Sequence, residues 1–190
     1  MQRDLHKEMK RTVNPALKTK PKMAHYVLRA ANLHRSIDWY SAVLEMHVVY
    51  RNEHLCFLTY DDEHHRLALA QTPVADLPPR GSPGLDHVAY TLESLEELLA
   101  TYRRLKGLDI LPAWPINHGL TTSLYYEDPD GNRVEFQVDN FATKDELNAF
   151  LYSDSFAENP IGVTFDPEIL LSRYENGDAI EELIKQGSAS

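Results

Sequence analysis

Histidine is unusually frequent in this chain, with nine among 190 residues, and it is the side chain that most often binds metal ions in proteins. His25 and His87 occupy similar places in two strand-like segments, AHYV and DHVAY. Glu135 lies in a later apolar segment of the second half, NRVEFQV. Two imidazoles and one carboxylate that leave coordination positions open form the ligand set of non-haem Fe(II) oxygen chemistry. The pattern alone leaves two interpretations open, which are a metal site and three unrelated core or surface residues.

The elements that would position these residues repeat in the same order. In the first half we expect a strand over 24–32, a helix over 32–46, and strands over 47–52, 54–61 and 65–72. In the second half we expect a strand over 84–92, a helix from the capping box at Ser94 to Gly107, and strands over 109–116, 120–128 and 132–139. The Pro- and Gly-rich segment 72–84 is a linker. The sequence thus predicts an α+β fold with two βαβββ modules, about 23–75 and 83–138, in one domain over 23–138.

Segments of opposite charge flank this domain. Residues 1–22 form a basic N-terminal arm, and residues 139–190 form an acidic extension. The extension contains helix starts at Thr143 and at Asp166-Pro167, and a third short helix is expected from Asp178. We expect these helices to cover the site, to cap the sheet or to make a dimer contact, and such a contact would give a homodimer or a higher homo-oligomer.

Composition excludes several classes of protein. The formal net charge of −10 argues against a nucleic-acid partner, which would favour a basic face. No apolar run approaches the roughly 18 residues of a membrane span, and the basic arm lacks the apolar core of a secretory signal. A single cysteine, Cys56, cannot form an internal disulfide, which fits a reducing compartment and predicts a cytoplasmic location.

One segment is far more specific than the rest. Between residues 116 and 135 the chain has a histidine, an apolar residue followed by a tyrosine, an acidic-Pro-x-Gly turn and a glutamate, which are His118, Leu124, Tyr125, Asp128, Pro129, Gly131 and Glu135. This pattern resembles the signature of single-domain extradiol ring-cleavage dioxygenases. The repeat over residues 23–138 resembles the wider vicinal oxygen chelate superfamily, which also contains glyoxalases and epimerases.

The resemblance implies a function and a role for each residue. It implies an Fe(II)-dependent dioxygenase, with Mn(II) as a possible metal, that inserts both atoms of O2 into a catechol. The family's iron ligands fall on His25, His87 and Glu135. Its active-site histidine falls on His65, the second of the pair His64-His65, and its remaining polar residues fall on His118 and Tyr125. His65 would hold or protonate oxygen species, His118 would orient the catechol, and Tyr125 would donate a hydrogen bond.

Two other classes of function stay open. A metal-dependent thiol transferase, lyase or epimerase of the same superfamily would use a fourth protein ligand near Ala68, where the sequence is apolar. A non-catalytic protein that binds an aromatic ligand would have no need of the complete residue set. Trp114, between two prolines and shortly before His118, is a candidate for lining an aromatic pocket.

Overall fold

A computed structural model describes residues 20–73 and 82–190 of the chain. The predicted basic arm lies almost entirely outside the described residues, as does most of the predicted linker. Among the described residues, no helix has the length and apolar character needed to cross a membrane.

The first module is a four-stranded sheet with one helix. It runs through β1 (Tyr26–Ala30), α2 (Leu33–Val43), β2 (His47–Arg51), β3 (Leu55–Thr59) and β4 (Leu67–Gln71), with spatial order β1-β4-β3-β2. Strands β1 and β4 are parallel, and the other pairs are antiparallel. Helix α2 begins where the Asn32 side chain accepts a hydrogen bond from the Arg35 amide.

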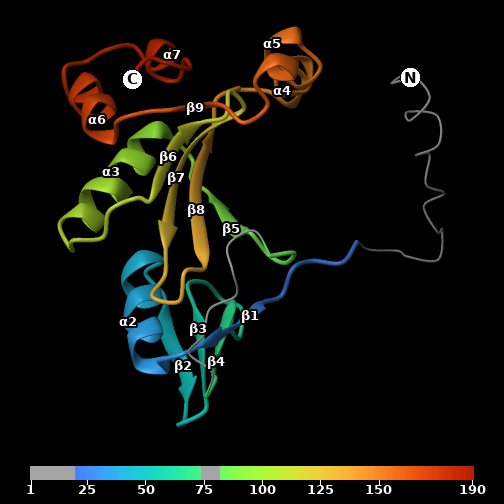
Figure 1. Cartoon of the computed structure of the whole chain (residues 1–190), viewed down its shortest axis with the longest axis vertical. Helices are drawn as coiled ribbons and strands as arrows, with labels where there is room; N and C mark the ends of the chain where they lie inside the picture. The colour runs from blue at the N-terminus through green and yellow to red at the C-terminus, as the bar shows by residue number, and fades with distance from the viewer. Residues whose placement is uncertain (1–19, 74–81) are drawn as a thin grey trace.

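The second module repeats this plan. It runs through β5 (His87–Thr91), α3 (Leu95–Lys106), β6 (Trp114–Asn117), β7 (Thr121–Glu127) and β8 (Arg133–Asp139). Its sheet has the order β5-β8-β7-β6-β9, in which β5 and β8 are parallel. The predicted α+β fold with two strand-rich modules is confirmed (Figure 1). The strand expected over 109–116 begins only at Trp114, because Asp109 has a positive φ of 59° and Pro112 has no amide to donate.

The C-terminal extension contains α4 (Lys144–Leu151), α5 (Asp154–Glu158), β9 (Val163–Thr164), α6 (Pro167–Glu175) and α7 (Ile180–Leu183). Helices α4, α6 and α7 match the three predicted helices, whereas α5 and β9 were not predicted. The short strand β9 pairs with β6 and so extends the second sheet. Helix α6 contacts α3, and Figure 1 shows the whole extension gathered around the second module.

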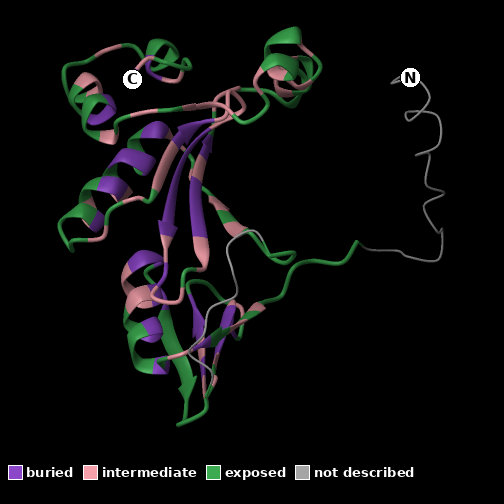
Figure 2. Cartoon of the chain, in the orientation of Figure 1, coloured by how far each residue is buried: buried purple, intermediate pink, exposed green. Residues whose placement is uncertain are grey.

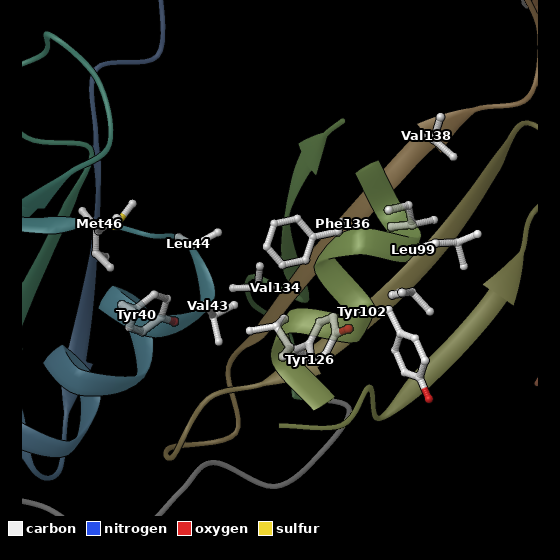
Figure 3. Close-up of a cluster of buried hydrophobic side chains, with 14 of the residues drawn as sticks. Tyr40, Val43, Leu44, Met46, Leu99, Tyr102, Tyr126, Val134, Phe136 and Val138 are labelled. Atoms are coloured by element: carbon white, nitrogen blue, oxygen red, sulfur yellow. The ribbon is translucent and has the colours of Figure 1, made fainter. Parts of the chain in front are cut away.

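One hydrophobic core joins both modules and the extension. Figure 3 shows Val43 and Leu44 at the end of α2 approaching Val134 and Phe136 of β8. The Tyr40 hydroxyl also donates to Asp128 across this junction at 3.0 Å. Figure 2 shows the buried residues concentrated on α3, β7 and β8, whereas β2 is exposed along its length.

A pair of tyrosines makes a second connection between the modules. The hydroxyls of Tyr26 on β1 and Tyr90 on β5 lie 2.7 Å apart. The ring of Tyr60 meets the Tyr90 ring edge-on, with a centroid distance of 5.9 Å. The hydroxyl contact connects β1, which directly follows His25, with β5, which begins at His87.

Candidate metal centre and its surroundings

The two modules place equivalent residues at equivalent sheet positions. On β8 the partner of His87 is Arg133, and Glu135 lies two residues further on, opposite Ala89. On β4 the Arg66 carbonyl accepts from the Tyr26 amide, and two residues after Arg66 the partner of Val27 is Ala68. Ala68 therefore occupies in the first module the place that Glu135 occupies in the second.

The same correspondence extends to the neighbouring strands. Tyr125 on β7 lies opposite Glu135, and Phe57 on β3 lies opposite Ala68. The first module thus carries an apolar pair where the second carries a polar pair.

His87 and Glu135 are in direct contact. His87 Nε2 lies 3.1 Å from Glu135 Oε2, and Glu135 is only 4% exposed. The other ring nitrogen, Nδ1, lies 2.8 Å from the Asp86 carboxylate. The hydrogen bond from His87 lowers the pKa of Asp86. A carboxylate on the far nitrogen of a metal-binding histidine orients the ring and raises its basicity, which fits His87 as a ligand.

Tyr125 and His118 lie beside this pair. The Tyr125 hydroxyl is 3.1 Å from His118 Nε2, and the Tyr125 ring meets His87 edge-on at 5.2 Å between centroids. Burial, followed by the charge of Glu135 and a hydrogen bond to it, raises the pKa of Tyr125. The phenol therefore keeps its proton at neutral pH and is available as a donor. Trp114 packs on both rings, 5.0 Å from Tyr125 and 5.8 Å from His118.

The first module gathers its own histidines. The His65 ring stacks on Phe57 with an angle of 8° between the planes, and its centroid lies 4.2 Å from that of His25. Nδ1 of His65 is 2.6 Å from Nδ1 of His64, so one of these two nitrogens carries the proton and donates it to the other. Burial, followed by the neighbouring His25 and His64, lowers the pKa of His65, which favours its neutral form.

The predicted site residues therefore fall into two groups. One contains His87, Glu135, His118 and Tyr125, and the other contains His25 and His65. Among residues 20–73 and 82–190, the structure does not gather three or more His, Cys, Asp or Glu side chains in an arrangement that could hold a metal ion. The donors of the second module still fit a divalent cation, because Glu135 is a buried carboxylate and the His87 imidazole lies beside it.

Sequence reasoning missed two contributors to this region. Asp86 directly precedes His87, and the adjacent pair Asp-His was the signal that could have identified it. The Ile161 carbonyl contacts His118 Nδ1 at 2.5 Å. No sequence signal marks this contact, because it is made by backbone from the C-terminal extension.

The chain is similar to known proteins in sequence and in structure. The sequence model of the Glyoxalase/Bleomycin resistance protein/Dioxygenase superfamily matches residues 22–136. "Biphenyl-2,3-diol 1,2-dioxygenase 2" of Rhodococcus globerulus is 47% identical over 165 residues, which cover 86% of each chain. "Biphenyl-2,3-diol 1,2-dioxygenase 3" of the same organism is 44% identical over 86% of this chain and 87% of its own length. A glyoxylase/bleomycin resistance protein/dioxygenase domain from Frankia sp. EAN1pec shares the fold, with a TM-score of 0.56 and 19% identity over 66% of this chain and 96% of its own.

Proposed function

Because this chain belongs to the Glyoxalase/Bleomycin resistance protein/Dioxygenase superfamily, we propose the chemistry of its ring-cleaving members for it. It is an extradiol dioxygenase that inserts both atoms of O2 into a catechol-type aromatic. The observation that carries this proposal is the similarity to two biphenyl-2,3-diol dioxygenases along most of both chains. Biphenyl-2,3-diol is therefore the first substrate to test.

His25, His87 and Glu135 would hold the metal, which we take to be Fe(II), with Mn(II) as the alternative. When bound, such an ion would supply a Lewis acid that binds the catechol oxygens together with dioxygen. The contact between His87 and Glu135 supports two of the three assignments. His25 is assigned from its equivalence to His87, since it directly precedes β1 and His87 begins β5.

The remaining polar residues would move or hold protons. His118 would accept a hydrogen bond from a catechol hydroxyl through Nε2, because Nδ1 faces a carbonyl oxygen. Tyr125, whose raised pKa keeps it protonated, would donate to oxygen as negative charge develops there. His65, held neutral by its lowered pKa, would take a proton from an oxygen species or return one.

The equivalence of Ala68 and Glu135 favours ring cleavage over the other metal-dependent reactions of the superfamily. A carboxylate at Ala68 would complete a four-ligand protein site, whereas the methyl group leaves that corner open. Ring cleavage needs open positions because substrate and dioxygen must bind together.

The direct test is reconstitution of the full chain with Fe(II) without oxygen, followed by oxygen uptake with biphenyl-2,3-diol and with catechol. We expect oxygen consumption and a coloured ring-opened product, with His87→Ala lowering turnover by at least ~100-fold. His34→Ala is the matched control, because His34 is an exposed histidine that lies 2.8 Å from Asp38 on α2. Full turnover by His87→Ala, or no oxygen uptake with any catechol by the metal-loaded chain, would refute the proposal.

A cytoplasmic location and a homodimer are further parts of this proposal. The single cysteine supports the first. The second is supported by α4 and α5, which bury none of their residues. Fractionation of cells and sedimentation of the purified chain test these two statements.

A further inference from the structure

His118 would face the substrate without binding the metal, and the C-terminal extension contacts the chain on both sides of it. On one side of His118, Asn117 donates from its side chain to the Ile184 carbonyl at 2.7 Å. Gln186 donates in turn to the Asn117 carbonyl at 3.1 Å. On the other side, a Cβ on Gly119 would lie 2.5 Å from the Phe150 ring of α4. The backbone around His118 is thus in contact with the extension in both directions along the chain.

The closest of these contacts is made by the segment that leads into β9. Gly162 has a φ of +112°, and a Cβ there would lie 2.3 Å from the Asn117 oxygen and 2.7 Å from the His118 Cα. Only glycine allows this approach. It brings the carbonyl of the preceding residue, Ile161, to 2.5 Å from His118 Nδ1. In Figure 1 the segment runs beside β6 at the edge of the second sheet.

A carbonyl oxygen only accepts hydrogen bonds, so Nδ1 of His118 must carry the proton in this contact. In a neutral imidazole, Nε2 is then without a proton and is an acceptor. The Tyr125 hydroxyl lies 3.1 Å from that nitrogen. The protein backbone therefore fixes which ring nitrogen of His118 is presented to Tyr125.

We propose that the C-terminal extension is part of the active site, because the Ile161 carbonyl holds His118 as the Nδ1–H tautomer and so makes Nε2 an acceptor for the substrate. Asn159 is the positioning residue of this device. Its side chain accepts from the Gly162 amide at 3.0 Å and donates to the Gly162 carbonyl at 2.9 Å, which fixes the loop that carries the Ile161 carbonyl. This inference rests on the proposed function only for the identity of the substrate.

The tautomer is measured directly by nitrogen-15 NMR of histidine side chains in the full chain without metal. We expect the His118 signals of the unaltered chain to show a protonated Nδ1 and an unprotonated Nε2. An Nε2–H tautomer would overturn the proposal. Because this measurement needs neither metal nor turnover, it is independent of whether the chain is a dioxygenase.

Asn159→Ala tests the role of the loop. We expect a mixture of the two His118 tautomers and a kcat/KM for the catechol that is lower by about 10-fold in the Fe(II)-loaded enzyme, because the acceptor is no longer aimed. Asn148→Ala is the matched control, since Asn148 is an exposed residue of α4 in the same extension. An unchanged tautomer and an unchanged kcat/KM in Asn159→Ala would overturn the proposal.

Asn159→Asp provides a second variant if Asn159→Ala does not fold. It keeps the acceptor for the Gly162 amide and loses the donor to the Gly162 carbonyl. We expect a change in the same direction for both measurements, because a carboxylate oxygen would face the Gly162 carbonyl without a proton between them. No change in either would again contradict the inference.

Discussion

At the scale of single residues, the chemistry of the proposed metal centre depends on which group faces each histidine nitrogen. His87 lies between two carboxylates, with Glu135 on Nε2 and Asp86 on Nδ1. Glu135 is buried, whereas the Asp86 side chain is 73% exposed. Water therefore weakens the contribution of Asp86, but the hydrogen bond still sets the ring orientation.

Removal of this orienting carboxylate should weaken metal binding. In Asp86→Ala we expect the affinity for Fe(II) to fall roughly 10-fold, because Nδ1 loses its partner and Nε2 becomes less basic. A metal titration followed by fluorescence measures the change. Asp38→Ala removes a carboxylate–histidine contact of the same 2.8 Å length from the surface of α2 and should leave the affinity unchanged. Equal affinities in the Asp86→Ala variant and the unaltered chain would contradict this role.

At the scale of elements, the hydrogen-bonded pair Tyr26–Tyr90 connects strands β1 and β5. His25 directly precedes β1 and His87 begins β5, so this contact sets the relation between two proposed ligands from different modules. The loss of one hydroxyl leaves the other partly buried without its partner.

A double-mutant cycle tests this connection. Tyr26→Phe and Tyr90→Phe should each lower the free energy of unfolding by about 1 kcal/mol, and the double variant should lower it by less than the sum. Urea denaturation gives the values. Tyr50→Phe is the control, because the Tyr50 side chain is exposed and its hydroxyl accepts from Asn52 in its own module. Strict additivity of the two changes would show that the hydroxyls do not interact.

The same pair makes stability depend on pH in the alkaline range. Burial raises the pKa of Tyr90 from 10.0 to about 12, and burial likewise raises the pKa of Tyr26. Above pH ~10 the unfolded chain loses tyrosine protons that the folded chain keeps, so the free energy of unfolding falls as pH rises. Below that range both states are protonated and the contribution is complete. Urea midpoints measured across this range should fall less steeply in Tyr90→Phe, and an identical slope would contradict the assignment.

The sequence predicted the elements that carry strong periodic or capping signals. Helices α3 and α4 are capped by Ser94 and Thr143, whose side chains accept from the expected backbone amides. Strand β9 could not be predicted, because two residues carry no periodicity and its pairing with β6 depends on Gly162. The contact of the Ile161 carbonyl with His118 could not be predicted either, because it is made by backbone in this same segment without periodicity. Asp86 was within reach of the sequence, since it adjoins His87.

At the scale of the whole molecule, the C-terminal extension contributes to the common core. Leu170 of α6 is 2% exposed and belongs to the cluster that includes residues of both modules. Glu168, on the same helix α6, accepts hydrogen bonds from Lys106 and Tyr102 of α3. The extension should therefore unfold together with the two modules.

Leu170→Ala tests this coupling. We expect the free energy of unfolding to fall by about 3 kcal/mol, because a cavity replaces a fully buried side chain. Fluorescence of Trp39 and Trp114, which lie outside the extension, and far-ultraviolet circular dichroism should give the same lowered midpoint. Ile169→Ala on the exposed side of α6 should cost less than about 1 kcal/mol. A fluorescence midpoint that does not move in Leu170→Ala would show that the extension unfolds separately.

The chain has one cysteine, and Cys56 on β3 is fully buried in the core of the first module. Burial also raises the pKa of its thiol, so the reactive thiolate is scarce while the sheet is closed. An alkylating reagent should therefore modify the protein only during openings of the first sheet. The rate at which the mass of the protein increases then measures how often this sheet opens. A metal ion held by His25 and His87, as proposed above, would connect the two modules and should slow this rate.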